Sequence, residues 1–170
     1  MKKTFKNIIE NTNNILFLGQ KSFSTEIIEN KHEEIDLAGS QIGLCVFNDC
    51  KFFNVSFRAS NFYECIFNNC VFEKCNFYKC TFAECIFNNC SINNCSITKA
   101  EIEYNHILNS NFQNVEFGAT IFLESTIVNT TFKENNTRGV MGNIWYGKTK
   151  ETLERILDVE DLFNKLETSV

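Results

Sequence analysis

The sequence predicts an all-β solenoid, in which a short extended segment followed by a turn repeats along one axis. Every fifth residue from Leu37 to Phe132 is Phe, Ile or Leu, at twenty successive positions without a phase slip. The segment CIFNNC occurs at Cys65–Cys70 and again at Cys85–Cys90, and the similar CVFNDC occupies Cys45–Cys50. A five-residue period suits neither an α-helix nor an alternating strand. The twenty-residue recurrence indicates that four five-residue units make one coil, so that residues twenty apart stack.

The five-residue unit also predicts which side chains fill the interior. Strand alternation points the Phe, Ile or Leu of each unit and the residue two positions earlier in the same direction. The large side chain fills the interior, and the small one packs beside it. Twenty units make about five coils and, at about 4.8 Å per stacked strand, a rod roughly 24 Å long. The predicted core is centred on Phe47, Phe52, Phe57, Phe62, Phe67, Phe72, Phe77, Phe82 and Phe87.

All nine cysteines fall in the series of small residues, two positions before the large ones. They are Cys45, Cys50, Cys65, Cys70, Cys75, Cys80, Cys85, Cys90 and Cys95. Stacked cysteines have backbones close enough for disulfides, but their parallel side chains do not point at each other. The spacing is also unlike the CxxC of a zinc site. We therefore expect buried free thiols acting as small apolar residues, with no metal, cofactor or disulfide; the disulfide or metal site is the alternative.

Composition sets limits on the class of protein. The chain has 170 residues, 44% of them hydrophobic, with 18 Phe, no Pro and a formal net charge of −5. This length suffices for one domain with a real core, and the charge argues against direct nucleic-acid or membrane-surface binding. The apolar run Ile15–Leu18 is too short for a signal peptide or a membrane span. We expect a cytoplasmic protein, where thiols stay reduced.

The units CNFYK (Cys75–Lys79) and CTFAE (Cys80–Glu84) follow the order small, polar, Phe or Leu, polar, polar. In this pattern the chain resembles the pentapeptide repeat proteins, and the resemblance covers about residues 35–134. It implies a right-handed quadrilateral β-helix; the handedness and the square section come from the resemblance alone. The expected organisation is an N-terminal cap over 1–34, the β-helix over 35–134, and a linker with a helical cap or dimerisation element over 135–170.

The two ends differ from the repeats. Phe5, Ile8 and Ile9 have the spacing of a short amphipathic helix, and the run Ile15–Gly19 looks like a strand that starts the first coil. At the C-terminal end two apolar stripes point in different directions on a single helix. They predict two short helices broken near Asp158, which is a candidate N-cap. Ile144, Trp145 and Tyr146 should pack against the last coil.

Sorting the units by stacking column predicts four faces. One face carries five carboxylates and no Lys or Arg: Glu64, Glu84, Glu101, Glu103 and Glu124. The next face is rich in Asn and carries an outward apolar stripe of Val46, Ile66 and Ile86. Asn105 falls in the inward small-residue series, so its buried amide must find partners; we expect hydrogen bonds to the nearby main chain, and a distortion of that coil is the further expectation. His32 and His106 have no neighbours that suggest a ligand set.

No nucleophile with a base, glycine-rich phosphate loop or metal cluster stands out, so we expect no enzyme. Within the family it resembles, the best understood members protect type II topoisomerases from quinolones by resembling DNA, and dimerise through C-terminal helices. The resemblance thus implies a DNA mimic that binds DNA gyrase or topoisomerase IV and confers fluoroquinolone resistance, with the five glutamates as contact. The alternatives are a protein–protein adaptor using the apolar stripe and the Asn-rich face, and a structural scaffold without a dedicated partner.

Overall fold

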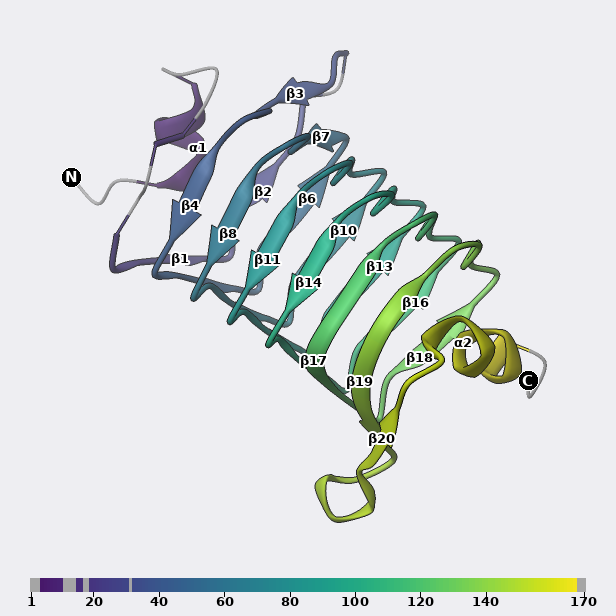
Figure 1. The fold of residues 1–170 in the computed structure, drawn as a ribbon. Helices are drawn as coiled ribbons and strands as arrows, with labels where there is room; N and C mark the ends of the chain where they lie inside the picture. Colours follow the sequence, from purple (N-terminus) through teal and green to yellow (C-terminus); the bar gives the residue numbers. More distant parts are fainter. Residues whose placement is uncertain (1–3, 11–14, 17–18, 31, 168–170) are drawn as a thin grey trace.

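The computed structural model of the protein describes residues 4–10, 15–16, 19–30 and 32–167. They form a parallel β-solenoid of about six turns with a short helix near each end (Figure 1). The predicted solenoid is confirmed, but five coils were too few, because segments at both ends continue the coil outside the regular five-residue series.

Two adjoining faces belong to one sheet, twelve-stranded in the described part of the chain. The acidic face is built from the first group of strands: β4 (Gln41–Gly43), β8 (Asn61–Tyr63), β11 (Thr81–Ala83) and β14 (Glu101–Glu103). The Asn-rich face is built from the second: β1 (Lys21–Ser24), β5 (Cys45–Asn48), β9 (Ile66–Asn68), β12 (Ile86–Asn88) and β15 (His106–Leu108). The long strand β17 (Ile121–Val128) pairs with both β14 and β15, so it turns the corner between the two faces.

The other two faces are separate. A six-stranded sheet forms the third face: β2 (Ile27–Ile28), β6 (Lys51–Phe53), β10 (Val71–Glu73), β13 (Ser91–Asn93), β16 (Asn111–Gln113) and β18 (Thr131–Lys133). The fourth face has β3 (Ile35–Asp36) paired with β7 (Val55–Ser56), and continues as isolated bridges from Ser56 through Asn76, Ser96 and Glu116 to Asn136. Because each coil repeats the same four segments, residues at equivalent positions of successive coils stack in a column on each face.

The turns between segments explain why a five-residue unit folds this way. From Leu44 to Glu134 the last residue of each unit has φ between +46° and +58°, the left-handed region. Asn tolerates this region best among residues with a side chain, and it occupies many of these positions. Its amide also bonds to the residue one coil away: Asn69 to Asp49 at 3.0 Å, and Asn89 to Asn69 at 2.8 Å. Turns and amide ladders therefore hold the twenty-residue register.

Aromatic rings form continuous columns inside the solenoid. Phe47 stacks on Phe67 with ring centroids 5.1 Å apart, and Phe57 stacks on Phe77 at 5.4 Å. Neighbouring columns meet edge to face, the geometry that aromatic pairs prefer. Of the nine phenylalanines at the centre of the predicted core, eight are buried and Phe87 is half-buried.

The cysteine ladder is confirmed as buried and free of disulfides. These thiols do more than fill space, because several of them donate a hydrogen bond to a main-chain carbonyl of the preceding coil. Cys80 Sγ lies 2.9 Å from Phe57 O, as Thr120 Oγ1 lies 2.6 Å from Ile97 O. A cysteine and a threonine therefore make the same contact at this position of the unit. Burial raises the pKa of the Cys80 thiol to about 12.

Asn105 occupies the same inward series without distorting its coil, contrary to expectation. Its Oδ1 accepts from Cys85 N at 2.7 Å, and its Nδ2 donates to Phe82 O at 2.8 Å. The twenty-residue register continues unchanged on both sides. The amide bonds the same two kinds of main-chain group as Ser125 one coil further along, whose Oγ accepts from Asn105 N and donates to Ile102 O.

The N-terminal segment pairs with the first regular coil. β1 pairs with β5, and β2 with β6, each at an offset of 24 residues instead of 20. Helix α1 (Phe5–Ile9) confirms the predicted amphipathic helix, and the Glu26 carboxylate accepts from Phe5 N and Lys6 N at 2.9 Å. Leu16 pairs with Gln41 as the predicted first strand requires; Phe17 and Leu18 lie outside the described residues.

The C-terminal end corrects one prediction. Strand β19 (Met141–Gly147) continues the coil, a 3₁₀ turn covers Lys150–Thr152, and β20 (Glu154–Ile156) pairs back on β19, where the first helix was expected. Gly142 allows the offset to shift from 20 to 19 residues, since a Cβ there would lie 1.7 Å from Phe122 O. The second helix, α2 (Val159–Glu167), begins after Asp158, whose Oδ1 accepts from Asp161 N at 2.9 Å. Its Phe163 stacks on Phe132 at 4.1 Å and covers the core.

Candidate functional site

The structure places all five predicted glutamates on the acidic face. Glu64, Glu84 and Glu124 are turn residues in the left-handed region, and they form one column along a corner of the solenoid. Glu101 and Glu103 lie on β14, with their side chains outward from a buried Ile102. Glu64, Glu84 and Glu101 are exposed, and Glu103 and Glu124 are half-buried.

Glu124 differs from the other four because it is already bonded. Its carboxylate accepts from the Arg155 guanidinium at 2.6 Å and from Trp145 Nε1 at 3.2 Å. Both partners belong to the hairpin of β19 and β20, which sequence reasoning did not predict. The described residues form two ion pairs, Arg155 with Glu124 and Lys165 with Asp161. Neither involves the other four glutamates of the acidic face.

Two exposed tyrosines stand among these carboxylates, and sequence reasoning passed over both. Tyr63 is 45% exposed and Tyr104 is 58% exposed. The pKa of Tyr63 is raised by a hydrogen bond with the Glu64 carboxylate and by the charges of Glu64 and Glu84. Tyr104 follows Glu84 in the corner column, one coil further along. The signal was available in the stacking column, where Tyr104 replaces a glutamate.

The fourth face has the opposite charge and uses its tyrosine differently. Arg58, Lys79 and Lys99 lie 5.7, 5.4 and 5.8 Å from the centre of the Tyr78 ring. We call this cluster the basic face. Every cation–π contact found in the described part of the chain lies on Tyr78. The two tyrosines of the acidic face therefore lack the partner that Tyr78 has.

The apolar stripe lies beside the acidic column. Val46, Ile66 and Ile86 are half-buried and stack directly through β5, β9 and β12. Two adjoining hollows begin where the stripe ends. One of ≈ 450 Å³ is lined by Glu84, Ile86, Tyr104 and His106, and one of ≈ 340 Å³ is lined by Ile86, His106, Leu108, Thr126, Lys150 and Leu153.

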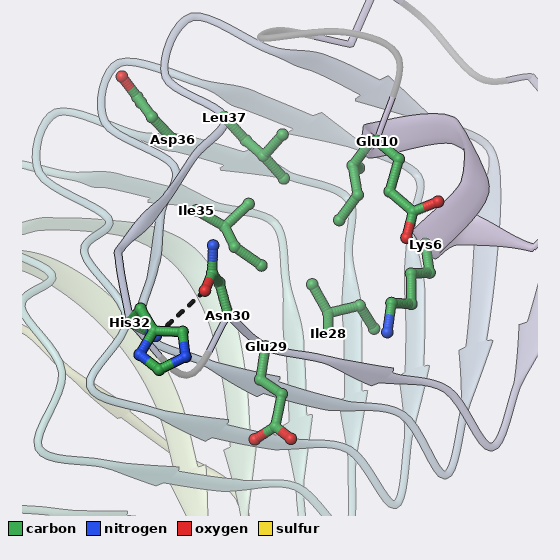
Figure 2. A pocket seen from close by; sticks show the side chains of 10 residues that line it. Lys6, Glu10, Ile28, Glu29, Asn30, His32, Ile35, Asp36 and Leu37 are labelled. Atoms are coloured by element: carbon green, nitrogen blue, oxygen red, sulfur yellow. Dashed lines mark hydrogen bonds between the residues drawn. The ribbon is translucent and has the colours of Figure 1, made fainter.

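A third hollow, of ≈ 570 Å³, lies at the N-terminal end between α1 and the segment before β3. Ile28, Ile35 and Leu37 form its apolar part, with Lys6 and Glu10 contributed by α1 and the residue following it (Figure 2). His32 N donates to Asn30 Oδ1 at 3.1 Å on its far side. Helix α1 packs its Phe5 against Phe23, Phe47 and Phe52 at this end of the core.

The described residues contain no group of three or more His, Cys, Asp or Glu side chains placed to hold a metal ion. None of their helices has the length and apolar character needed to cross a membrane.

The family model for pentapeptide repeats matches eight copies, over residues 50–89 and 65–103. The same five-residue unit and twenty-residue register extend beyond the matched residues to Ile35 and Lys133. Over the matched residues the chain is similar to the pentapeptide repeat family. A search of curated proteins found no match.

Several solved pentapeptide repeat structures are similar to the chain. Rfr23 from the cyanobacterium Cyanothece 51142 has a TM-score of 0.47 at 12% identity, over 79% of this chain and 90% of its own. HetL from Nostoc sp. strain PCC 7120, involved in heterocyst differentiation regulation, has 0.29 at 6%, over 81% and 72%. Trypsin-treated QnrB1, a plasmid-mediated fluoroquinolone resistance protein, has 0.24 at 11%, over 76% and 91%. Similarities this low carry no argument about function.

Proposed function

We propose that this pentapeptide repeat protein is a non-catalytic binding protein whose acidic face contacts a basic surface of a type II topoisomerase, DNA gyrase or topoisomerase IV, in place of DNA. Pentapeptide repeat proteins are generally structural or binding proteins without catalysis. One observation carries the proposal: Glu64, Glu84, Glu101 and Glu103 lie together on the acidic face and its corner, where the described residues include no Lys or Arg of the same stacking column. Such a face attracts a cationic surface and repels nucleic acid.

The magnitude of the charge limits the mimicry to a short stretch of DNA. A duplex carries one charge per about 1.7 Å, whereas successive coils lie about 4.8 Å apart. The four unpaired carboxylates spread over three coils, and Glu124 is neutralised by Arg155. The face therefore replaces a few phosphates, and its main effect is on the rate and salt dependence of association.

The proposal is tested by binding to purified gyrase. Changing Glu64, Glu84, Glu101 and Glu103 together to Gln removes the charge and keeps the shape. We expect a loss of affinity of at least tenfold and a weaker dependence on salt. Glu124 is left unchanged, since its bond to Arg155 holds the β19–β20 hairpin.

A matched control comes from the basic face. The double variant Lys79→Glu, Lys99→Glu reverses two exposed charges of the same solenoid and should change gyrase binding less than the four Gln changes. Equal unfolding midpoints for all three proteins show that the fold is kept. Wild-type protein that binds neither topoisomerase contradicts the proposal, and an adaptor role through Val46, Ile66 and Ile86 then becomes the leading account.

Homodimerisation through the C-terminal end is part of the proposal. Leu157 lies two residues before the start of α2 and is 71% exposed, so it is available to a second copy. Deleting α2 would uncover the core at Phe132, so the sharper variant is Leu157→Asp. Sedimentation should give a dimer for the wild type and a monomer for Leu157→Asp. A monomeric wild type at tens of micromolar, which is on the order of the dissociation constant of a weak dimer, contradicts the proposed homodimer.

A further inference from the structure

We propose that the two adjoining hollows at the corner of the acidic and Asn-rich faces are one binding site for a protein segment that carries an arginine next to an apolar residue. The inference deepens the proposed function, because it takes the acidic face as a contact surface. It goes further by naming the side chains that the partner inserts and the residues that receive them.

The two hollows form one continuous site because Ile86 and His106 line both of them. Glu84 and Tyr104 form the end on the acidic face. Leu108 and Leu153 lie at the other end, on the Asn-rich face, where Lys150 and Leu153 come from the segment between β19 and β20. The site thus has a charged end and an apolar end, and two parts of the chain far apart in sequence build it.

The charged end matches the chemistry of an arginine. Glu84 and Tyr104 occupy the same corner position in successive coils, and Glu84 N donates to the carbonyl of Glu103, the residue before Tyr104. A guanidinium can pair with a carboxylate and lie over a tyrosine ring at the same time. The basic face shows that a tyrosine on this backbone accepts cations, since three surround Tyr78. Tyr104 is 58% exposed and has no such cation in the described part of the chain.

The apolar end fixes the orientation of the partner. Ile86, Leu108 and Leu153 are half-buried and leave space between them. An apolar side chain placed there removes further apolar surface from water. Lys150 lines the same end and repels a second cation. A segment can therefore bind with its arginine at Glu84 and its apolar residue at Leu153, but not in the reverse direction. Nucleic acid is disfavoured because its phosphates would face Glu84.

The probe for this site is a blocked octapeptide of alternating arginine and leucine, titrated into the full-length protein and followed by NMR shifts of its backbone amides. We expect shifts centred on Ile86, Tyr104 and His106. The same peptide with citrulline in place of arginine keeps the shape without the charge, and it should bind at least fivefold more weakly.

Variants test each end of the site. Tyr104→Leu should weaken peptide binding about twofold to fivefold, the size of an exposed cation–π contact, and Glu84→Gln together with it about tenfold. Leu153→Ala should weaken the arginine–leucine peptide but not an arginine–glycine peptide. The matched control is Tyr78→Leu on the basic face, which should leave the affinity unchanged. Tyr104 is exposed, so its variant keeps the test valid if Leu153→Ala unfolds.

The outcomes separate this inference from the gyrase proposal. Selective peptide binding that depends on Tyr104 supports the site even if gyrase does not bind. The inference is overturned by no binding, by equal binding of the citrulline peptide, or by an unchanged affinity for Tyr104→Leu, whatever gyrase does. Concentration-dependent shifts at the same residues without peptide would make a second copy of the chain the occupant and would also overturn it.

Discussion

Two successive coils have the same backbone and fill the interior differently. The first contributes Phe72, Phe77, Phe82 and Phe87, and we call it the Phe coil; the second contributes Ile92, Ile97, Ile102 and Ile107, and we call it the Ile coil. Both keep the twenty-residue register to their neighbours. Each ring of the Phe coil stacks on a ring of the preceding coil, with centroids 4.8 to 5.4 Å apart. At the Ile coil the columns stop, and a hollow of ≈ 30 Å³ remains, lined by apolar side chains from both coils and by Phe112.

The two coils show that turns and main-chain ladders set the backbone, while side-chain volume determines how tightly the interior is packed. The missing ring atoms cost on the order of 1 kcal/mol at most, from the usual cost per volume of a cavity. The Ile coil also holds the buried Asn105 in the column where the Phe coil has Cys85.

The largest effect is expected from emptying the Phe coil. Phe77→Ala removes a ring stacked on Phe57 and should cost about 3–5 kcal/mol of unfolding free energy. Ile97→Ala removes fewer atoms from a site that already borders the hollow, so it should cost less. Denaturant titration compares the two variants. A loss below about 1 kcal/mol for Phe77→Ala would mean that the inward register is wrong.

Asn105 should show the next largest effect. Asn105→Val leaves Cys85 N and Phe82 O without their partner and should cost about 1–3 kcal/mol. Asn105→Ser should be nearly neutral, because Ser125 in the same column serves equivalent groups: it accepts from Asn105 N and donates to Ile102 O. Unfolding midpoints measured side by side decide this; equal losses for both variants would contradict the role given to the amide.

Filling the hollow should have a smaller and opposite effect. Ile97→Phe adds ring atoms beside the hollow and should raise stability by up to about 1 kcal/mol. Ile127→Phe is the matched control, because Ile127 is fully buried outside the hollow and overpacking there should cost about 1–3 kcal/mol. Thermal unfolding measures both, and destabilisation by Ile97→Phe as large as in the control would exclude usable space in the Ile coil.

The nine thiols should react with a thiol reagent only when the protein unfolds. Native protein at pH 8 should react very slowly with a thiol reagent, whereas denatured, unreduced protein should give all nine thiols. Two or more missing thiols would contradict the free ladder. Burial raises the pKa of the Cys80 thiol from 9.0 to about 12. The protonated thiol therefore stabilises the folded state fully below a pH of 9.0, and this stabilisation is lost as the pH rises from 9.0 to about 12. Cys80→Ser should reduce this loss of stability at high pH.

The regular interior was predictable because large and small residues recur without a phase slip, and this recurrence also placed the five glutamates on one face. The sequence also predicted the two terminal helices, but not how strands pair at the ends, since the 24-residue offset of β1 and β2 breaks the phase. The stripe of Leu153, Ile156 and Leu157 suits a helix equally well, and pairing with β19 decides that Glu154–Ile156 is a strand. Without that hairpin, neither the bond between Arg155 and Glu124 nor the hollow at Leu153 was predictable.

Competition with DNA for gyrase tests the proposed DNA mimicry, because a DNA substitute and DNA cannot occupy one gyrase surface together. A labelled duplex bound to gyrase is titrated with the wild-type protein and with the variant in which Glu64, Glu84, Glu101 and Glu103 are Gln. The account predicts that the wild type displaces the duplex, less so at higher salt, and that the variant displaces it at least tenfold less well. A complex in which protein and duplex are bound to gyrase together, or equal displacement by both proteins, would contradict it.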